Sequence, residues 1–182
     1  MLLREAALIE AAGHLFVQKG YEGTTIDDVI GAVGISKPTF YGHFASKEAL
    51  AVRVIVSGLE KALARVEAFA AVLPPGEAAR AMIEWAIDNQ SGLDGEPSFT
   101  GALAFFGHDD VLAAESKLTE RLADLINQGQ QAGTIKKAAQ PHILSRTFRS
   151  ILKDDSFFND LGGEKVSVAN MKADIIAMLL GE

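Results

Sequence analysis

The sequence predicts an all-α protein of about nine helices. Three observations support this prediction. Apolar residues recur three and four positions apart along most of the 182 residues, which is the spacing of one face of a helix. Residues that begin or end helices stand between these apolar runs. No run alternates apolar and polar side chains in the manner of a half-buried strand.

The composition narrows the class of protein. The chain is 48% hydrophobic, which is enough to bury a substantial core and argues against disorder. It has no cysteine, which excludes disulfide frameworks, thiolate zinc sites and cysteine nucleophiles. The longest apolar runs, 68–73 and 175–180, are much shorter than the roughly 20 residues that cross a bilayer. The first residues lack a signal-peptide core, so we expect a cytoplasmic protein.

The first two helices have clear boundary signals. Gly20 follows an apolar helical pattern and is expected to end the first helix. Thr25 is a candidate N-cap for the second, with Asp27 and Asp28 in the first turn, where the helix dipole favours negative charge. Gly34 then supplies the permissive backbone that a tight turn requires.

A short third helix and a long fourth helix follow that turn. Ser36 is placed to cap the third helix, with Pro38 in its first turn. Ser46 is placed to cap the fourth, which runs to about Leu73, where Pro74-Pro75-Gly76 stops it. Residues 1–47 are therefore predicted to form a three-helix domain and residues 48–182 a larger helical domain.

The remaining sequence continues the helical pattern after a loop-like segment at 91–97. In the motif His108-Asp109-Asp110, one of the two aspartates is expected to cap the following helix, because adjacent residues rarely converge on one metal ion. No metal site, cofactor or catalytic residue is therefore predicted. The expected helices span about 77–90, 100–107, 110–131, 141–161 and 168–180.

The third helix is the most informative element. A rotation of about 100° per residue places Phe40 and Phe44 on one inward face with Ile35. Pro38 and Gly42 then point most directly away from the core. Two short helices joined by a tight turn, the second with a polar and partly basic face, form the arrangement that enters the major groove of DNA.

The side chains beside that outward face suit DNA contacts. Lys37 could donate to guanine or phosphate, and the methyl group of Thr39 could meet a thymine methyl. Tyr41 and Lys47 suit phosphate contacts, which position a helix without reading sequence, whereas His43 could instead orient the fourth helix. The predicted DNA-binding residues are Thr25, Ser36, Lys37, Pro38, Thr39, Tyr41, Gly42, His43 and Lys47.

The charge distribution permits a nucleic-acid partner. The net charge is −7, which by itself opposes DNA binding. Residues 1–55 nevertheless hold 5 basic and 6 acidic side chains, so most of the excess acid lies elsewhere. Within 36–53, three basic residues stand against Glu48 alone.

Residues 9–53 resemble the DNA-binding domain of the tetracycline-repressor (TetR) family of bacterial regulators. Gly42 and the single basic residue Arg4 before the first helix depart from the family pattern, which favours modest affinity or greater reliance on DNA shape. The residues that carry the resemblance are Ala11-Ala12, Leu15-Phe16, Gly20-Tyr21, Thr24-Thr25, the run from Ile35 to Phe44, and the run from Ser46 to Leu50.

The resemblance implies a transcriptional regulator, typically a repressor, which is nucleoid-associated when bound to DNA. It implies a homodimer whose third helices enter successive major grooves of a pseudo-palindromic operator, with half-sites roughly 34 Å apart or a multiple of that. The last two helices of each subunit would form the dimer interface, although their apolar stripes could also close an intramolecular core. The interface candidates are Phe148, Ile151, Leu152, Ile175, Ile176 and Leu179.

The resemblance also implies a small-molecule effector among the helices at about 80–130. Aromatic and methionine side chains with a few polar groups suit an apolar or amphipathic ligand, although such residues also form ordinary cores. The candidates are Met82, Trp85, Asn89, Phe105, Phe106, His108, Arg121, Leu125, Gln128 and His142.

Two alternatives differ from this interpretation. One is a small helical enzyme, or a carrier of haem or another ligand, that uses His108 and His142. It would show turnover or an absorbing cofactor and would ignore operator DNA. The other is a related regulator controlled by a protein partner, or by nothing.

Overall fold

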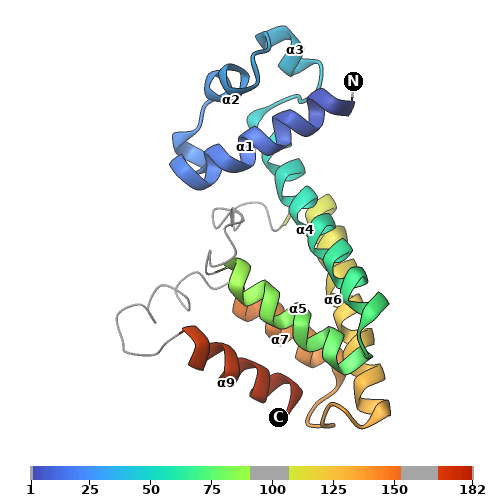
Figure 1. Cartoon of the computed structure of the whole chain (residues 1–182). Helices are drawn as coiled ribbons and strands as arrows, with labels where there is room; N and C mark the ends of the chain where they lie inside the picture. The colour runs from blue at the N-terminus through green and yellow to red at the C-terminus, as the bar shows by residue number, and fades with distance from the viewer. Residues whose placement is uncertain (1, 91–106, 153–167, 182) are drawn as a thin grey trace. The chain divides into compact units, whose positions relative to one another are not determined.

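The described residues form eight α-helices (Figure 1). The computed structural model describes residues 2–90, 107–152 and 168–181. The helices are α1 (Leu2–Gly23), α2 (Ile26–Val33), α3 (Lys37–Tyr41), α4 (Lys47–Val72), α5 (Pro75–Gln90), α6 (Asp109–Ala132), α7 (Pro141–Leu152) and α9 (Val168–Leu180). The all-α prediction is confirmed for these residues. The predicted loop at 91–97 and most of the predicted helix at 100–107 lie outside them, as does the end of the predicted helix at 141–161.

The local signals account for most helix boundaries. Gly20, the expected end of the first helix, instead marks a kink with a φ of 73° and a ψ of 165°, and α1 continues to Gly23. Ser46 accepts a hydrogen bond from the Ala49 amide at 3.1 Å, as an N-cap does. α4 ends at Val72, just before the two prolines. α5 starts at Pro75, two residues earlier than predicted, because proline is well tolerated in a first helical turn.

The predicted cap of α6 is wrong. The helix begins at Asp109, and both Asp109 and Asp110 lie in its first turn. The backbone carbonyl of His108 accepts the first intrahelical hydrogen bond, from the Leu112 amide at 2.9 Å. His108 therefore occupies the N-cap position, and the two carboxylates favour the helix through its dipole instead.

The chain divides into two compact units, each with its own hydrophobic core. Unit 1 contains the described parts of 1–60 and 97–114, and unit 2 contains the described parts of 61–96 and 115–182. Unit 1 therefore includes the start of α4, whereas the sequence places the domain boundary between residues 47 and 48; that functional boundary stays a prediction.

The core of unit 1 is built where α1, α2, α3 and the start of α4 meet. Its fully buried side chains include Leu8 and Phe16 of α1, Val29 of α2, Phe40 of α3 and Leu50 of α4. Phe40 is the buried side chain of α3, a helix of only five residues. Phe44, which follows α3, is buried in the same core.

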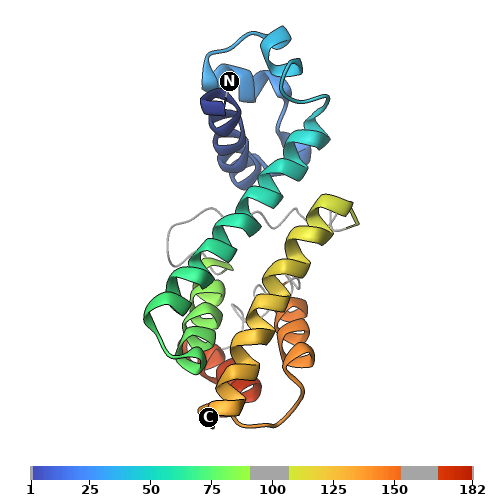
Figure 2. The ribbon, with the colours of Figure 1, turned by 90° about the vertical axis from the view of Figure 1, so that its right-hand side faces the viewer.

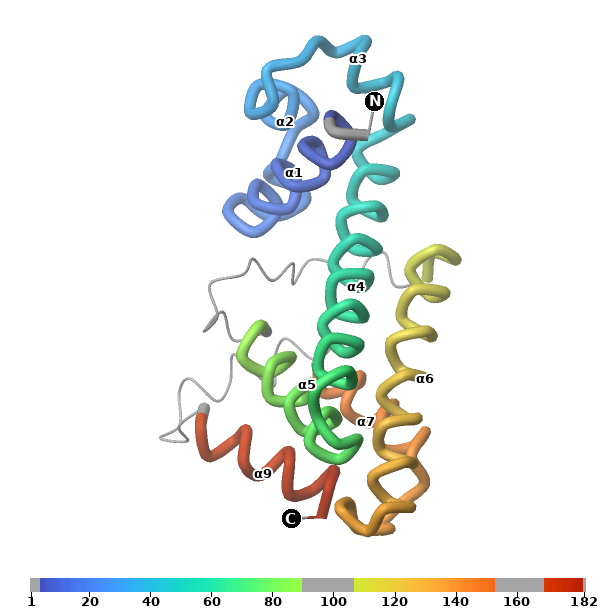
Figure 3. The backbone as a smooth tube through the Cα atoms, turned by 45° about the vertical axis from the view of Figure 1, so that its right-hand side comes forward, coloured from blue at the N-terminus to red at the C-terminus, as the bar shows by residue number. Residues whose placement is uncertain are grey.

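In unit 2, α5 packs against both α7 and α9. The second part of α4 runs beside α6 (Figures 2 and 3), and the Arg121 guanidinium of α6 donates to the Glu67 carboxylate of α4 at 2.8 and 3.0 Å. A second ion pair joins Lys172 of α9 to Asp88 of α5 at 2.7 Å. The core between these helices contains Ile83, Leu125 and other apolar side chains.

Candidate nucleic-acid interface

α2 is held at both ends by its own sequence. Thr25 has extended backbone angles, its hydroxyl accepts from the Asp28 amide at 3.1 Å, and the Asp28 carboxylate accepts from the Thr25 amide at 2.8 Å. This reciprocal pair is a capping box. At the other end Gly34 adopts a left-handed conformation with a φ of 72°, and its amide donates to the Ile30 carbonyl at 2.8 Å. The predicted cap and turn are confirmed.

α3 begins at the predicted serine. The Ser36 hydroxyl accepts from the Thr39 amide at 3.4 Å and lies 2.8 Å from the Thr39 hydroxyl. The rings of Phe40 and Phe44 are buried, with their centroids 6.0 Å apart. Since these two rings anchor the helix from below, its orientation on unit 1 is fixed by packing. The expected inward face is confirmed.

The opposite face of α3 is open to solvent. Lys37, Pro38, Tyr41 and Gly42 are exposed, while Thr39 and His43 are half-buried at its edges. The Tyr41 side chain is 50% exposed, although the edge of its ring packs against Phe40 with centroids 5.4 Å apart. The contact with Phe40 holds the Tyr41 ring in place, and the exposed hydroxyl can reach a phosphate. Contacts of these residues with DNA stay a prediction.

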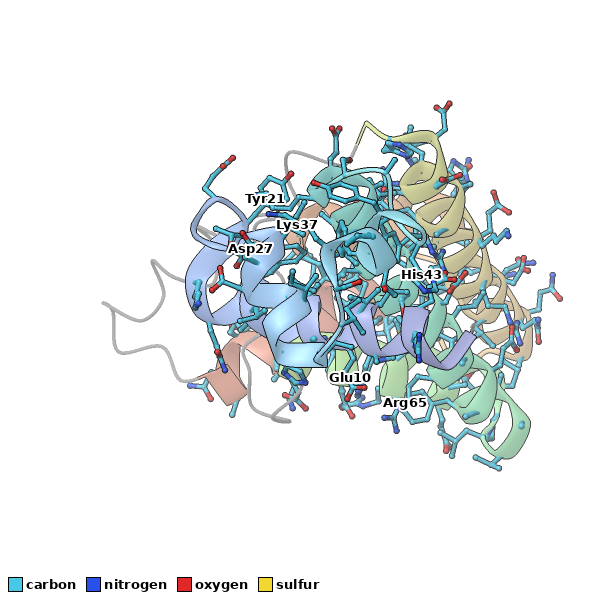
Figure 4. The ribbon with its side chains drawn as sticks, turned by 90° about the horizontal axis from the view of Figure 1, so that it is seen from above. Glu10, Tyr21, Asp27, Lys37, His43 and Arg65 are labelled. Carbon is cyan, nitrogen blue, oxygen red and sulfur yellow. The ribbon has the colours of Figure 1, made fainter. Side chains whose placement is uncertain are left out.

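Lys37 has a partner that the sequence did not reveal. Its ammonium lies 2.9 Å from one carboxylate oxygen of Asp27 and donates to the other at 3.1 Å. The two side chains, labelled in Figure 4, come from the first turns of α3 and α2. The hydrogen bond from Lys37 to Asp27 raises the pKa of the lysine, so it remains charged.

Lys47, predicted to contact phosphate, lies inside unit 1. Its ammonium donates to the backbone carbonyls of Tyr21 at 2.9 Å and Thr24 at 3.1 Å, and it stands 4.1 Å from the centroid of the Tyr21 ring. Burial raises the pKa of the Tyr21 phenol. Lys47 therefore joins the start of α4 to the end of α1 and to Thr24 just after it. A phosphate contact by this lysine stays a prediction.

The predicted effector residues range from fully buried to exposed. Met82 and Leu125 are buried in the core of unit 2, where Trp85 packs partly buried with the Arg65 guanidinium 5.6 Å from its ring centroid. Asn89 is half-buried, whereas Gln128, His142 and His108 are exposed. Arg121 is held by Glu67, and Phe105 and Phe106 lie outside the described residues. Met82, Trp85 and Leu125 belong to one apolar cluster.

The predicted dimer residues occupy the core of their own subunit. Phe148, Ile175, Ile176 and Leu179 are each at most 5% exposed, and Ile151 and Leu152 pack against the same cluster. Their apolar stripes thus close an intramolecular core, which was the alternative that the sequence left open. Among the side chains of these two helices that the structure describes, the exposed large apolar ones are Ile143 at 48% and Met178 at 55%.

The structure also shows an ion pair with a buried carboxylate that the sequence did not indicate. The Glu115 carboxylate of α6 is 3% exposed and accepts from the Arg149 guanidinium of α7 at 3.4 Å. No group of three or more His, Cys, Asp or Glu side chains that could hold a metal ion occurs among the described residues. In the same part of the chain, no helix is long and apolar enough to cross a membrane.

The comparisons with known proteins agree with this geometry. Residues 8–54 match the family model described as "Bacterial regulatory proteins, tetR family". The transcriptional repressor DhaR of Mycobacterium sp. (strain GP1) is 28% identical over 145 residues, which cover 76% of this chain and 73% of DhaR. Residues 8–54 thus form a DNA-binding domain of the TetR family of regulators.

Two solved structures extend the likeness to the whole fold. The transcriptional regulator FadR from Bacillus subtilis, solved in complex with stearoyl-CoA, superposes with a TM-score of 0.74 at 13% identity over 96% of this chain and 97% of FadR. AibR, solved in complex with isovaleryl coenzyme A and operator DNA, gives a TM-score of 0.68 at 18% identity over 97% and 98% of the two chains. The relatives and the fold are those of DNA-binding regulators, not of enzymes.

Proposed function

We propose that this TetR-family chain is a homodimeric repressor whose two α3 helices enter successive major grooves of a pseudo-palindromic operator. One observation carries the proposal: Phe40 and Phe44 fix α3 from its buried side, which leaves Lys37, Tyr41 and the caps of α2 and α3 facing outward. Recognition helices use such N-terminal side chains for base contacts and their flanks for phosphates. The acidic remainder of the chain disfavours nonspecific adhesion to DNA.

Selection of bound sequences from random double-stranded DNA tests this proposal. We expect an inverted repeat whose half-sites are centred roughly 34 Å apart or a multiple of that. Tyr41→Ala should weaken binding to every sequence, and Thr39→Ala should relax the preference at one position. Val17→Ala, an exposed apolar residue on α1, is the matched control. The absence of any selected sequence would contradict the proposal.

The dimer would use the outward sides of α7 and α9. Ile143 and Met178 are the exposed large apolar side chains of these helices, and large exposed apolar groups often mark association surfaces. We expect a dimer at low micromolar concentration by analytical ultracentrifugation, and a monomer for the double variant Ile143→Glu, Met178→Glu. Val72→Glu, at a residue that is 77% exposed outside these helices, is the control. A monomeric wild-type protein would exclude the interface.

The effector would be an apolar or amphipathic molecule bound in unit 2. Met82, Trp85 and Leu125 bring suitable side chains together there, and the folds of FadR and AibR accommodate acyl-CoA molecules. α4 has residues in both units, so a ligand that prefers one conformation of unit 2 would shift the population of DNA-competent dimers. Such a regulator would act in the bacterial cytoplasm, at the nucleoid when bound to DNA.

Fluorescence anisotropy on the selected operator tests the effector. Stearoyl-CoA and isovaleryl-CoA are the probes, with free coenzyme A as the control. We expect at least one acyl-CoA to release the operator and Leu125→Trp, which fills the same region, to abolish that release. Operator binding that is insensitive to both probes would contradict an acyl-CoA effector and would favour control by a protein partner.

A further inference from the structure

Lys37, the first residue of α3, forms an ion pair with Asp27 of α2. The Lys37 ammonium and an Asp27 carboxylate oxygen are 2.9 Å apart, and the two side chains are 51% and 67% exposed. One comes from the first turn of α3 and the other from the first turn of α2. A donor and an acceptor are thus presented side by side, at the end of the recognition helix that reaches base edges in helix-turn-helix proteins.

The Asp27 carboxylate lies in the first turn of α2, where the helix dipole favours it, but it takes no part in the capping box. The neighbouring Asp28 makes the capping box with Thr25 and also pairs with Lys19 at 2.8 Å. Within the ranges that the structure describes, the Asp27 carboxylate has Lys37 as its one hydrogen-bond partner. An ion pair this exposed adds little to folding stability. The pair is therefore free to exchange partners when a ligand reaches the start of α3.

We propose that Lys37 and Asp27 act as one unit that reads a G·C base pair in each half-site. This inference rests on the proposed DNA-binding function. In the major groove, guanine presents the acceptors O6 and N7, and its paired cytosine presents the N4 amino donor beside them. Lys37 would donate to guanine while Asp27 accepts from the cytosine N4. Both partners of the ion pair would then keep a hydrogen bond in the complex.

The carboxylate is what makes the lysine selective. A lone ammonium donates equally well to phosphate oxygens and to any acceptor on a base, whereas a carboxylate 2.9 Å away repels phosphate. At an A·T pair, the N6 amino donor of adenine would face the ammonium and the O4 acceptor of thymine would face the carboxylate, whereas a T·A pair would lose only the N7 acceptor. Asp27 should therefore lower nonspecific affinity and raise discrimination at one position.

The test compares Asp27→Ala, Lys37→Ala and a charge control by selection from random DNA and by anisotropy titrations in salt. Glu10→Gln is the control, since it removes one negative charge from α1 of the same unit, apart from Asp27 and Lys37 (Figure 4). Circular dichroism melting curves check that each variant is folded.

For the wild type we expect a G·C pair at one position of each half-site, with a loss of roughly 5- to 100-fold when it becomes A·T. Both alanine variants should lose most of that discrimination at this position only. Asp27→Ala should also bind nonspecific DNA more tightly. The slope of log affinity against log salt concentration (the salt slope) should become steeper by about one. Glu10→Gln should change neither quantity.

An Asp27→Ala protein that selects the same base pairs as the wild type would overturn the inference. So would an Asp27→Ala variant whose effects equal those of Glu10→Gln, or a wild-type preference for A·T at the position that Lys37→Ala alters. In each of these cases the wild type still selects an operator, so the proposed function survives. A wild type that selects no sequence would instead overturn the function itself.

Discussion

The Lys47 ammonium lies 4.1 Å from the centroid of the Tyr21 ring and donates to the carbonyl of that same residue at 2.9 Å. A second carbonyl, that of Thr24, accepts from it at 3.1 Å. Tyr21 lies in the last turn of α1, and Thr24 lies between α1 and α2. Lys47 of α4 thus fixes the position of the chain at Tyr21 and Thr24, just before the helix-turn-helix. These two partners lie 26 and 23 residues away in the sequence.

We expect Lys47→Met to destabilise unit 1 by about 2 kcal/mol, because it removes charge-assisted hydrogen bonds and leaves two carbonyls without that donor. Urea unfolding measures the loss, and Lys61→Met, at an exposed residue of the same helix, is the control. DNA affinity should fall without a change in salt slope, since the ammonium is already occupied. A slope reduced by about one with unchanged stability would show that Lys47 contacts phosphate instead.

The sequence alone predicted the helix caps and the inward-facing side chains correctly, because these features depend on neighbouring residues. Thr25 and Ser36 cap the helices expected of them, and Phe40 and Phe44 turn inward, because capping and helical spacing depend on residues within four positions. The bounds of α9 were also predicted correctly. Each of these features can be read from a few neighbouring residues.

Contacts between distant residues could not be predicted in the same way. The pairs Lys37–Asp27 and Arg149–Glu115 depend on how the helices pack together. A charged residue in the sequence does not show which residue of another helix it will contact. The stripe containing Phe148 and Ile176 shows the same limit, since an amphipathic pattern shows that a helix buries one face but not against what. Here that face is covered by the chain itself.

The capping box at Thr25 should contribute measurably to unit 1. We expect Thr25→Ala to lower the free energy of unfolding by about 1 kcal/mol, because the Asp28 amide loses its acceptor. Thr25→Ser keeps the hydroxyl and should retain most of that stability. Equal losses for the two variants would assign the effect to the threonine methyl group. Urea unfolding of the three proteins decides between these outcomes.

Stability should fall in acid partly through Asp28. The hydrogen bond from Lys19, followed by those from Thr25, holds the pKa of this carboxyl well below its ordinary value of 3.8. A carboxyl whose pKa is lowered by folding stabilises the fold above its unfolded pKa and loses that contribution as the pH falls through the folded value. The stability difference between wild type and Asp28→Asn should therefore shrink from pH 6 toward pH 3 in urea titrations.

A difference that stays constant over this range would show that the carboxylate charge does not matter. Glu67 provides a comparison in unit 2, because the hydrogen bond from Arg121 likewise lowers the pKa of its carboxyl. Glu67→Gln should remove a separate part of the acid sensitivity. The effects of the two substitutions should add, since their charge pairs share no residue.

Gly129 lets three segments of unit 2 approach closely. A Cβ atom at this position of α6 would stand 2.6 Å from the Cδ1 atom of Ile135 and 3.1 Å from the Cα atom of Gly76 in α5. Ile135 is 3% exposed in the core and Gly76 is backbone at that contact, so neither can withdraw freely. We expect Gly129→Ala to destabilise the protein by about 1–3 kcal/mol through overpacking, despite the better helix propensity of alanine.

Gly58 of α4 supplies the matched control, because a Cβ atom there would meet nothing within 4 Å. Gly58→Ala should stabilise the protein by about 0.4–1 kcal/mol, since alanine lowers the entropy of the unfolded chain. The melting temperature should therefore fall below that of the wild type for Gly129→Ala and rise above it for Gly58→Ala. A Gly129→Ala protein as stable as Gly58→Ala would mean that α5, α6 and Ile135 can separate without cost, which the close backbone contact between Gly129 and Gly76 argues against.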